Sequence, residues 1–237
     1  MTLARRLQPR WFPPSTHPYR ILERRAAQLL GPGARVLDAG CGRSAEVLRR
    51  LAGTAAEATG VDVVDLLPEA ASGIRFVRSS LEQVPLEAAS QDLIVSRSVM
   101  EHLENPLAVY REMHRLLQPG GHFVFLTPNL WDYASLISRI VPNRWHPALV
   151  HSLTGRDEAD TFPAYYRSNT KGKIRRLARE SGFEVVTLEY HGQYPDYLMF
   201  NSALFVAGSA YEKVISNVPP LRCLQGWILA VLRKEES

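Results

Sequence analysis

Residues 36–44 read Val-Leu-Asp-Ala-Gly-Cys-Gly-Arg-Ser, the stretch that indicates the fold most directly. Its apolar beginning is typical of a buried strand, which ends in the acid Asp38. Gly40 and Gly42 follow, and glycine allows a sharp turn and a close approach of the backbone to a ligand. A helix is expected directly after them, and a helix N-terminus presents free N–H groups. The stretch therefore predicts a strand, a turn and a helix arranged around a bound molecule.

A second strand is expected over residues 59–63, which read Thr-Gly-Val-Asp-Val. It places another acid, Asp62, near a strand tip. In nucleotide-binding folds, half of the binding unit consists of a strand, a glycine turn, a helix and a second strand whose acid follows about 20 residues later. The two acids and the glycine turn therefore predict a nucleotide-like ligand, but they do not say which one.

Strands and helices alternate along the chain. Further strands are expected over residues 74–78, 93–96, 122–126, 183–190 and 227–232, and helices over residues 19–30, 45–51, 105–117 and 171–180. This alternation predicts an α/β fold with a Rossmann-like, doubly wound, seven-stranded and mostly parallel sheet. Asn169 and Thr170 are expected to cap the start of the last of these helices, and Gly182 its end. The prolines within residues 1–20 forbid a single long helix there.

Residues 130–168 interrupt the alternation after the fifth strand. The segment is rich in aromatic residues, prolines and histidines, which flexible linkers lack. It therefore predicts an inserted helical and aromatic lobe.

The composition narrows the class of protein. The 237 residues, 46% of them hydrophobic, suit one globular domain. The formal net charge of +4 permits an anionic partner without demanding nucleic acid. Cys41 and Cys223 form no disulfide or zinc pattern, which favours a cytoplasmic location. The sequence has no run of about 18 apolar residues, so it predicts no membrane span.

Four segments carry a resemblance to a known family. They are residues 36–44, residues 60–62, residues 91–96 with Glu101-His102-Leu103, and residues 116–121 before a strand that ends in Thr127-Pro128-Asn129. Together they resemble the class I S-adenosylmethionine-dependent methyltransferases. Within that class the chain is similar to the small-molecule branch, which includes ubiquinone-biosynthesis O-methyltransferases and sugar and natural-product methyltransferases. Ser44 departs from the family, which often has a third glycine there, and is instead a candidate cap of the following helix.

The resemblance implies that residues 1–237 form a single methyltransferase domain with four parts. Residues 1–30 would form an N-terminal lid and helix, and residues 31–129 the cofactor-binding core. Residues 130–168 would form the acceptor-binding insert. Residues 169–237 would complete the core.

The resemblance also implies roles for residues around S-adenosylmethionine, which becomes S-adenosylhomocysteine. Asp62 would accept hydrogen bonds from both ribose hydroxyls. Val63 would flank the adenine, and Ser80 and Leu81 would meet the adenine amine.

Asp38 would reach the ammonium group of the methionine end. Ser96 and Arg97 would line the methionine and methyl end. The backbone of Gly40, Cys41 and Gly42 would pass close to the cofactor. Cys41 is interpreted as a packing residue rather than a nucleophile.

The expected reaction is direct methyl transfer, most simply to oxygen, with a general base if the acceptor is a hydroxyl group. His102 and His151 are the candidate bases, although His102 also belongs to the family's usual signature and can be structural. Acceptor contacts are expected from His17, Tyr19, Trp131, His146, Tyr165 and Tyr166. Packing of the N-terminal helix is the alternative role of His17 and Tyr19. The acidic run at residues 157–160 is interpreted as a solvent-exposed loop, so no metal site is predicted.

Other interpretations stay open. Residues 40–45 also fit the glycine pattern of NAD(P)-dependent oxidoreductases, but Asp38 and the Pro119-Gly120-Gly121 turn favour a methyltransferase. A nucleic-acid methyltransferase is disfavoured because Ser96-Arg97-Ser98-Val99 replaces that class's Asn/Asp-Pro-Pro motif. The third alternative is a non-enzymatic cofactor-binding scaffold.

The expected partner is a small-molecule or lipid-linked saccharide acceptor rather than nucleic acid. The protein is expected to be a monomer or a homodimer. The apolar residues at 198–206 have two interpretations. Burial between the sixth and seventh strands or in a dimer interface is favoured, and peripheral contact with the inner membrane face, together with the basic N-terminus, is the alternative. The sequence does not identify the acceptor, or whether oxygen, nitrogen or carbon is methylated.

Overall fold

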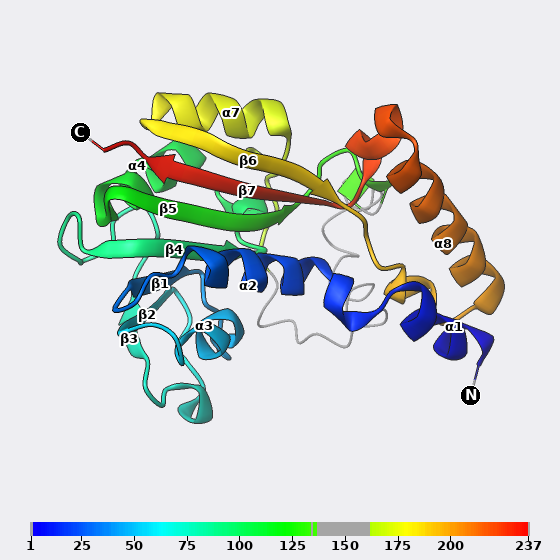
Figure 1. The fold of residues 1–237 in the computed structure, drawn as a ribbon, viewed down its shortest axis with the longest axis horizontal. Coiled ribbons are helices and arrows are strands. Elements are labelled where there is room, and N and C mark those ends of the chain that lie inside the picture. Colours follow the sequence, from blue (N-terminus) through cyan, green and yellow to red (C-terminus); the bar gives the residue numbers. More distant parts are fainter. Residues whose placement is uncertain (1, 134, 137–161, 237) are drawn as a thin grey trace.

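The computed structural model describes residues 2–133, 135–136 and 162–236. Within them, seven strands form one sheet in the order β3-β2-β1-β4-β5-β7-β6 (Figure 1). The strands are β1 Arg35–Ala39, β2 Glu57–Asp62, β3 Arg75–Arg78, β4 Gln91–Arg97, β5 Leu117–Pro128, β6 Phe183–His191 and β7 Trp227–Lys234. Strands β1 to β5 pair in parallel, and β7 runs antiparallel to both β5 and β6. The predicted α/β fold with a mostly parallel sheet is confirmed.

Helices cover both faces of the sheet (Figure 1). α2 Pro18–Leu29 and α3 Glu46–Leu51 cover one face, and α4 Pro106–Leu116 and α7 Lys171–Glu180 cover the other. Two further helices, α1 Leu3–Trp11 and α8 Ser202–Asn217, lie beyond the sheet at one end. Successive side chains of a strand point to opposite faces, so neighbouring residues of β1 enter different cores. Val36 packs with residues of α2 and α3, and Leu37 packs with residues of α4 and α7. The sheet is therefore buried on both faces beneath the site.

Local signals placed several helix ends correctly. The helix predicted over residues 171–180 is α7, and the Thr170 hydroxyl accepts a hydrogen bond from the Lys173 N–H at 3.2 Å. Gly182 has a φ of +83°, as expected of the residue that ends a helix. Prolines divide the N-terminal segment into α1 and α2, although α1 includes Pro9.

Two local expectations need correction. Ser44 does not cap α3, because the N-cap position belongs to Ala45, which has a φ of +43° and makes no side-chain capping bond. The Pro119-Gly120-Gly121 turn does not precede the fifth strand but lies inside β5, which already begins at Leu117. Gly120, with a φ of +77°, lies where the pairing of β5 with β4 is interrupted between Leu117 and His122.

Helices α1 and α8 pack together at one end of the molecule (Figure 1). The Ala4 N–H donates to the Ser202 hydroxyl at 3.3 Å, and the Trp11 ring stacks on Phe205 with centroids 6.2 Å apart. No helix in the described part of the chain is both long and apolar enough to span a membrane.

Candidate functional site

A cleft of about 1110 Å³ opens at the carboxyl ends of β1, β2 and β4. Strand β1 leads to β2 on one side and has β4 on the other, so the cleft lies where the strand order reverses. Open α/β sheets bind their ligands at such switch points. The predicted site residues that line it are Tyr19, Asp38, Gly40, Cys41, Gly42, Asp62, Val63, Ser80, Leu81, Arg97, His102 and Tyr165.

The glycine turn is fastened to β2. The N–H groups of Gly40 and Cys41 both donate to the Val61 carbonyl, at 2.8 and 3.2 Å. The Gly42 N–H donates to Asp62 Oδ2 at 2.7 Å. These three N–H groups are therefore engaged within the protein. The glycines of the turn matter for their conformation, with φ of +80° at Gly40 and +63° at Gly42.

Replacing Gly40 by alanine is expected to lower the free energy of unfolding by more than about 1 kcal/mol, because a strained backbone alone costs on the order of 1–3 kcal/mol. A Cβ atom there would lie 2.3 Å from Val99 Cγ2, in addition to the unfavourable φ. Gly42→Ala is the matched control, because its Cβ would meet nothing within 4 Å. Urea unfolding should therefore show the larger loss for Gly40→Ala, and Gly40→Ala/Val99→Ala should recover part of it. Equal losses at both glycines would contradict the steric argument.

Asp38 lies one residue before the end of β1 as a buried acid, with 1% of its surface exposed. Its Oδ1 atom is buried and makes no hydrogen bond to the protein. Burial raises the pKa of Asp38 to about 7, with a further upward contribution from the Asp62 charge, while Arg97 lowers it. A buried carboxylate with an unbonded oxygen suits a ligand that carries a positively charged hydrogen-bond donor, because that donor would complete the hydrogen bonding of Asp38. Burial also raises the pKa of the Cys41 thiol, which supports a packing role for that side chain.

Asp62 stands at the tip of β2 with both carboxylate oxygens held by the backbone. Oδ2 accepts from Gly42 and Oδ1 accepts from the Val64 N–H at 3.1 Å. Each carboxylate oxygen can accept more than one hydrogen bond, so this orientation leaves capacity for two further donors. Val63 beside it is 47% exposed and offers an apolar surface to the same cleft.

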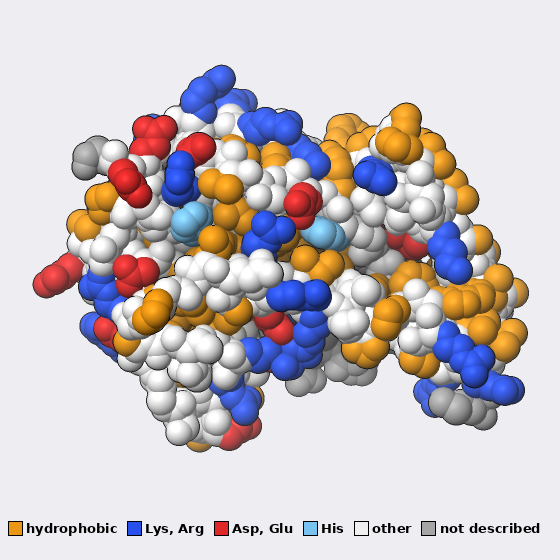
Figure 2. Space-filling model, in the orientation of Figure 1, with side chains coloured by type: hydrophobic (Ala, Val, Ile, Leu, Met, Phe, Trp, Pro, Cys, Tyr) orange, Lys and Arg blue, Asp and Glu red, His pale blue; other side chains and the backbone are white. Residues whose placement is uncertain are grey.

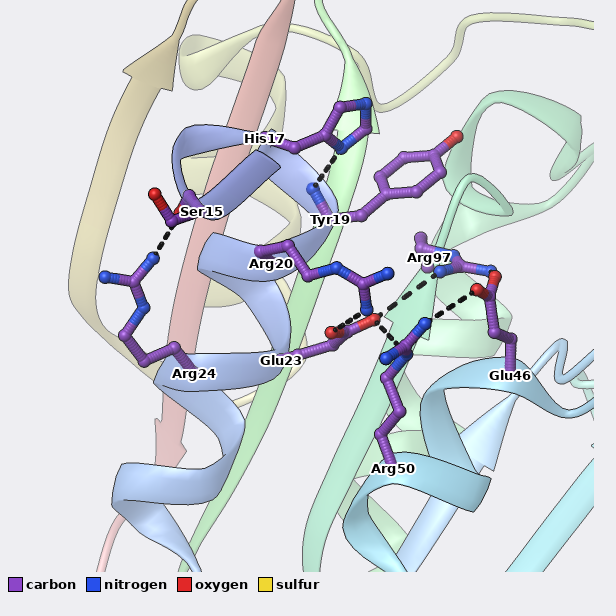
Figure 3. A network of polar contacts seen from close by, with 9 residues as sticks. All are labelled: Ser15, His17, Tyr19, Arg20, Glu23, Arg24, Glu46, Arg50 and Arg97. Atoms are coloured by element: carbon purple, nitrogen blue, oxygen red, sulfur yellow. Dashed lines mark hydrogen bonds and ion pairs between the residues drawn. The ribbon is translucent and has the colours of Figure 1, made fainter. Parts of the chain in front are cut away.

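Arg97 ends β4 and joins three elements around the cleft (Figure 3). Its guanidinium lies 2.8 Å from Glu46 of α3 and 3.8 Å from Glu23 of α2. It also lies 4.4 Å from the centroid of the Tyr19 ring, which gives a cation–π contact. Arg50 binds the same two acids, each at 3.2 Å. The network fixes the guanidinium and the Tyr19 ring at the mouth of the cleft.

Ser96 is not placed where the sequence suggested. Its hydroxyl is buried and donates to the Ala39 carbonyl at 2.7 Å, and Ser96 does not line the cleft. Alternate residues of a strand face opposite sides, but this one turns toward the neighbouring β1 backbone. It therefore fastens β4 to β1 just behind the glycine turn.

His102 lies at the rim, where residues after 162 pass over the end of β4. Its Nδ1 is 2.9 Å from the Pro163 carbonyl, and its Nε2 is 3.9 Å from Glu101 Oε1. A carbonyl oxygen only accepts, so Nδ1 carries the proton of this hydrogen bond. Nε2 of the neutral ring is then free to take up a proton. The Glu101 carbonyl accepts from the N–H groups of Tyr165 and Tyr166, which holds this segment against the site.

Only some of the residues predicted to contact the acceptor lie at the cleft. Tyr19 and Tyr165 line the cleft, whereas His17, Trp131 and Tyr166 do not. His17 instead accepts from the Tyr19 N–H at 3.2 Å as the N-cap of α2, and Trp131 is 53% exposed. His146 and His151 lie outside the described residues, as does the acidic run at residues 157–160. Within the part of the chain that is described, no group of acids, histidines and cysteines could hold a metal ion.

Sequence reasoning missed Glu46, Val99 and the pairing of His102 with Glu101. Glu46 lies in the first turn of α3, where acids are common for reasons of helix stability, so its pairing with Arg97 carries no local signal. Val99 follows Ser98, whose φ of +57° redirects the chain over the Gly40 turn. A left-handed serine is not readable from the sequence.

A doubly wound sheet with this cleft and two acids at neighbouring strand tips defines a domain that binds a nucleotide-like cofactor. A family model described as a methyltransferase domain matches residues 5–188, and the chain belongs to this family. The sheet order is that of the class I methyltransferases, the class that is defined by the use of S-adenosylmethionine.

The chain is also similar to individual proteins. It is 35% identical to a probable S-adenosylmethionine-dependent methyltransferase of Mycolicibacterium smegmatis, over 74% of this chain and 60% of that protein. It is 31% identical to a ubiquinone biosynthesis O-methyltransferase of Xanthomonas campestris, over 51% of this chain and 57% of that protein. The aligned part thus spans somewhat more than half the length of these relatives.

Among solved structures, the fold is similar to an S-adenosylmethionine-dependent methyltransferase from Mesorhizobium loti. The two share a TM-score of 0.60 and 20% identity, over 90% of this chain and 98% of that one. This likeness supports the fold alone.

Proposed function

We propose that this protein transfers the methyl group of S-adenosylmethionine to a hydroxyl group of a small molecule or a lipid-linked saccharide. The observation that carries the proposal is the pair of acids around the cleft. Asp38 has a buried oxygen that lacks a hydrogen bond, and Asp62 is held with acceptor capacity to spare. These groups suit the ammonium and the ribose hydroxyls that the cofactor carries.

The residues of the chain then have distinct tasks. Asp38 binds the ammonium, Asp62 the ribose hydroxyls, and Val63 with Leu81 gives an apolar wall for the adenine. The Arg97 guanidinium and the Tyr19 ring close the methionine end. S-adenosylmethionine supplies an electrophilic methyl group, so the protein needs chiefly to align the acceptor, exclude water and receive a proton.

Methylation of oxygen is favoured by the rim of the cleft. His102 offers a free Nε2 there, and Glu101 at 3.9 Å is placed to stabilise the protonated ring. A hydroxyl acceptor releases a proton as its oxygen gains the methyl group, and Nε2 would take that proton. The similarity to an enzyme named as an O-methyltransferase supports the same choice.

Binding and turnover test the proposal separately. Calorimetry should detect S-adenosylhomocysteine binding to the purified protein and no comparable binding of NAD(H). A screen with labelled S-adenosylmethionine against phenols, sugars and lipid-linked saccharides should then find the acceptor. Tight binding of NAD(H) without S-adenosylhomocysteine binding would overturn the proposed function.

His102→Ala is expected to lower kcat by about 10²–10⁴-fold, the usual contribution of a general base. The affinity for S-adenosylhomocysteine should change little, because His102 stands at the acceptor side. His122→Ala is a control, since His122 belongs to β5 and does not line the cleft. Equal rates of the His102→Ala variant and the wild type would assign His102 a structural role.

A further inference from the structure

Helix α8 exposes an apolar face to solvent. Phe205, Ser209, Glu212 and Ile215 point inward, so the helix buries its only acid. Its outer face carries Leu204, 45% exposed, and Val214, 53% exposed, and Phe200 just before the helix is 72% exposed. Figure 2 shows hydrophobic side chains along the edge of the molecule that α8 occupies in Figure 1. A helix that needed only water on this side would carry polar residues there.

Helix α1 places positive charge beside that apolar face. It packs on α8, and its exposed side chains include Leu3, Arg5, Arg6 and Arg10. Residues 2–22 contain no acidic residue. The Lys213 ammonium of α8 lies 4.5 Å from the centroid of the Trp11 ring, at the seam between the two helices.

Of the acids Glu212 and Asp196, which are close to these helices, only Asp196 is exposed, against three exposed arginines of α1. Glu212 is buried and accepts from the Gln193 N–H at 3.0 Å. Asp196 lies 3.5 Å from the Gln8 side-chain amide, beside α1. The combined surface is therefore apolar and basic together, over two adjacent helices.

We propose that the α1–α8 face, formed by Leu3, Arg5, Arg6, Arg10, Phe200 and Leu204, docks the protein onto an anionic phospholipid surface. Exposed apolar side chains enter the boundary between headgroups and acyl chains, and arginines neutralise lipid charge beside them. Charge favours this occupant over a second copy of the chain, because two copies would bring like-charged arginines together. The inference stands on this surface and does not depend on the proposed methyl transfer.

The experiment is co-sedimentation of the full chain with vesicles of two parts phosphatidylcholine to one part phosphatidylglycerol, and with phosphatidylcholine alone. Binding is expected for the anionic vesicles only, and it should weaken as salt is raised. Arg5→Glu/Arg6→Glu should lower the partition coefficient at least tenfold, since each basic residue near such a surface contributes about 1 kcal/mol. Phe200→Ser/Leu204→Ser should lower it by a similar factor.

Matched controls lie on the other parts of the molecule. Arg111→Glu/Arg175→Glu makes the same change in net charge on α4 and α7, and Val186→Ser removes an exposed apolar residue from β6. Circular dichroism should be unchanged in all variants, and both controls should sediment like the wild type.

Absence of binding to the anionic vesicles would overturn the proposal. So would binding that the control substitutions weaken as much as the α1–α8 variants do. A dimer seen by light scattering that Phe200→Ser/Leu204→Ser dissociates, without vesicle binding, would instead assign the face to self-association.

Discussion

Asp62→Ala is expected to weaken the binding of S-adenosylhomocysteine at least tenfold, which corresponds to about 1.4 kcal/mol or more. The carboxylate is held by the N–H groups of Gly42 and Val64, so its remaining acceptor capacity faces the cleft. Hydrogen bonds from the two ribose hydroxyls to a charged oxygen are each worth more than a neutral pair. Titration calorimetry on the variant and the wild type measures the difference directly.

Asp65→Ala provides the matched control for this measurement. Asp65 lies on the same loop, but it pairs with Arg78 at 3.0 Å and both side chains are well exposed. Its loss should leave the affinity within about twofold, because exposed ion pairs contribute little. If Asp62→Ala also bound as the wild type does, the ribose would have to be held by another residue.

Asp38→Asn is expected to weaken the binding of S-adenosylhomocysteine at least as much as Asp62→Ala does. It should also remove the dependence of that affinity on pH. Burial raises the pKa of Asp38 to about 7 in the protein without cofactor. A proton must therefore leave this carboxyl before it can receive an ammonium. Between pH 7 and pH 5 the wild-type affinity should fall by up to about tenfold per pH unit, since one proton competes with the ligand. The Asp38→Asn variant should show a flat profile over the same range.

The same substitution should have the opposite effect on stability. The pKa of Asp38 rises from 3.8 to about 7 on folding, so the folded state favours the protonated acid. The contribution of Asp38 to stability is therefore complete below pH 3.8 and is lost as the pH rises through 7. At pH 8 the cofactor-free variant should unfold with a free energy higher by on the order of 1–3 kcal/mol, because it buries no charge. A variant that lost both affinity and stability at pH 8 would contradict this account.

The site was predictable wherever it depends on residues that are close in sequence. Asp38 precedes the glycine turn directly, and Asp62 ends the next strand, so parallel pairing brings their strand tips together. Ser96 was placed wrongly because a strand pattern gives the alternation of faces but not the hydrogen bond that its hydroxyl makes to Ala39. Arg97 was expected at the methionine end, but its partners Glu46 and Glu23 come from helices on other parts of the chain.

The acceptor side was the least predictable part. The aromatic segment after β5 gave many candidate residues of similar character, and only long-range contacts separate them. Tyr165 reaches the cleft, with its N–H held by the Glu101 carbonyl, whereas Trp131 of the same segment is exposed and does not line the cleft. His17, from the N-terminal segment, caps α2 instead. Such contacts depend on chain segments far apart in sequence, which no local pattern encodes.

By itself the sequence determined the order of strands and helices, the glycine turn and the two acids at strand tips. These follow from side-chain period, from the conformational freedom of glycine and from short connections, which are all local properties. The tertiary structure alone decided which N–H groups of the turn bond to β2, that His102 lies at the rim beside Glu101, and that α8 turns an apolar side outward. Each of these depends on what packs against a residue, and packing is a property of the whole fold.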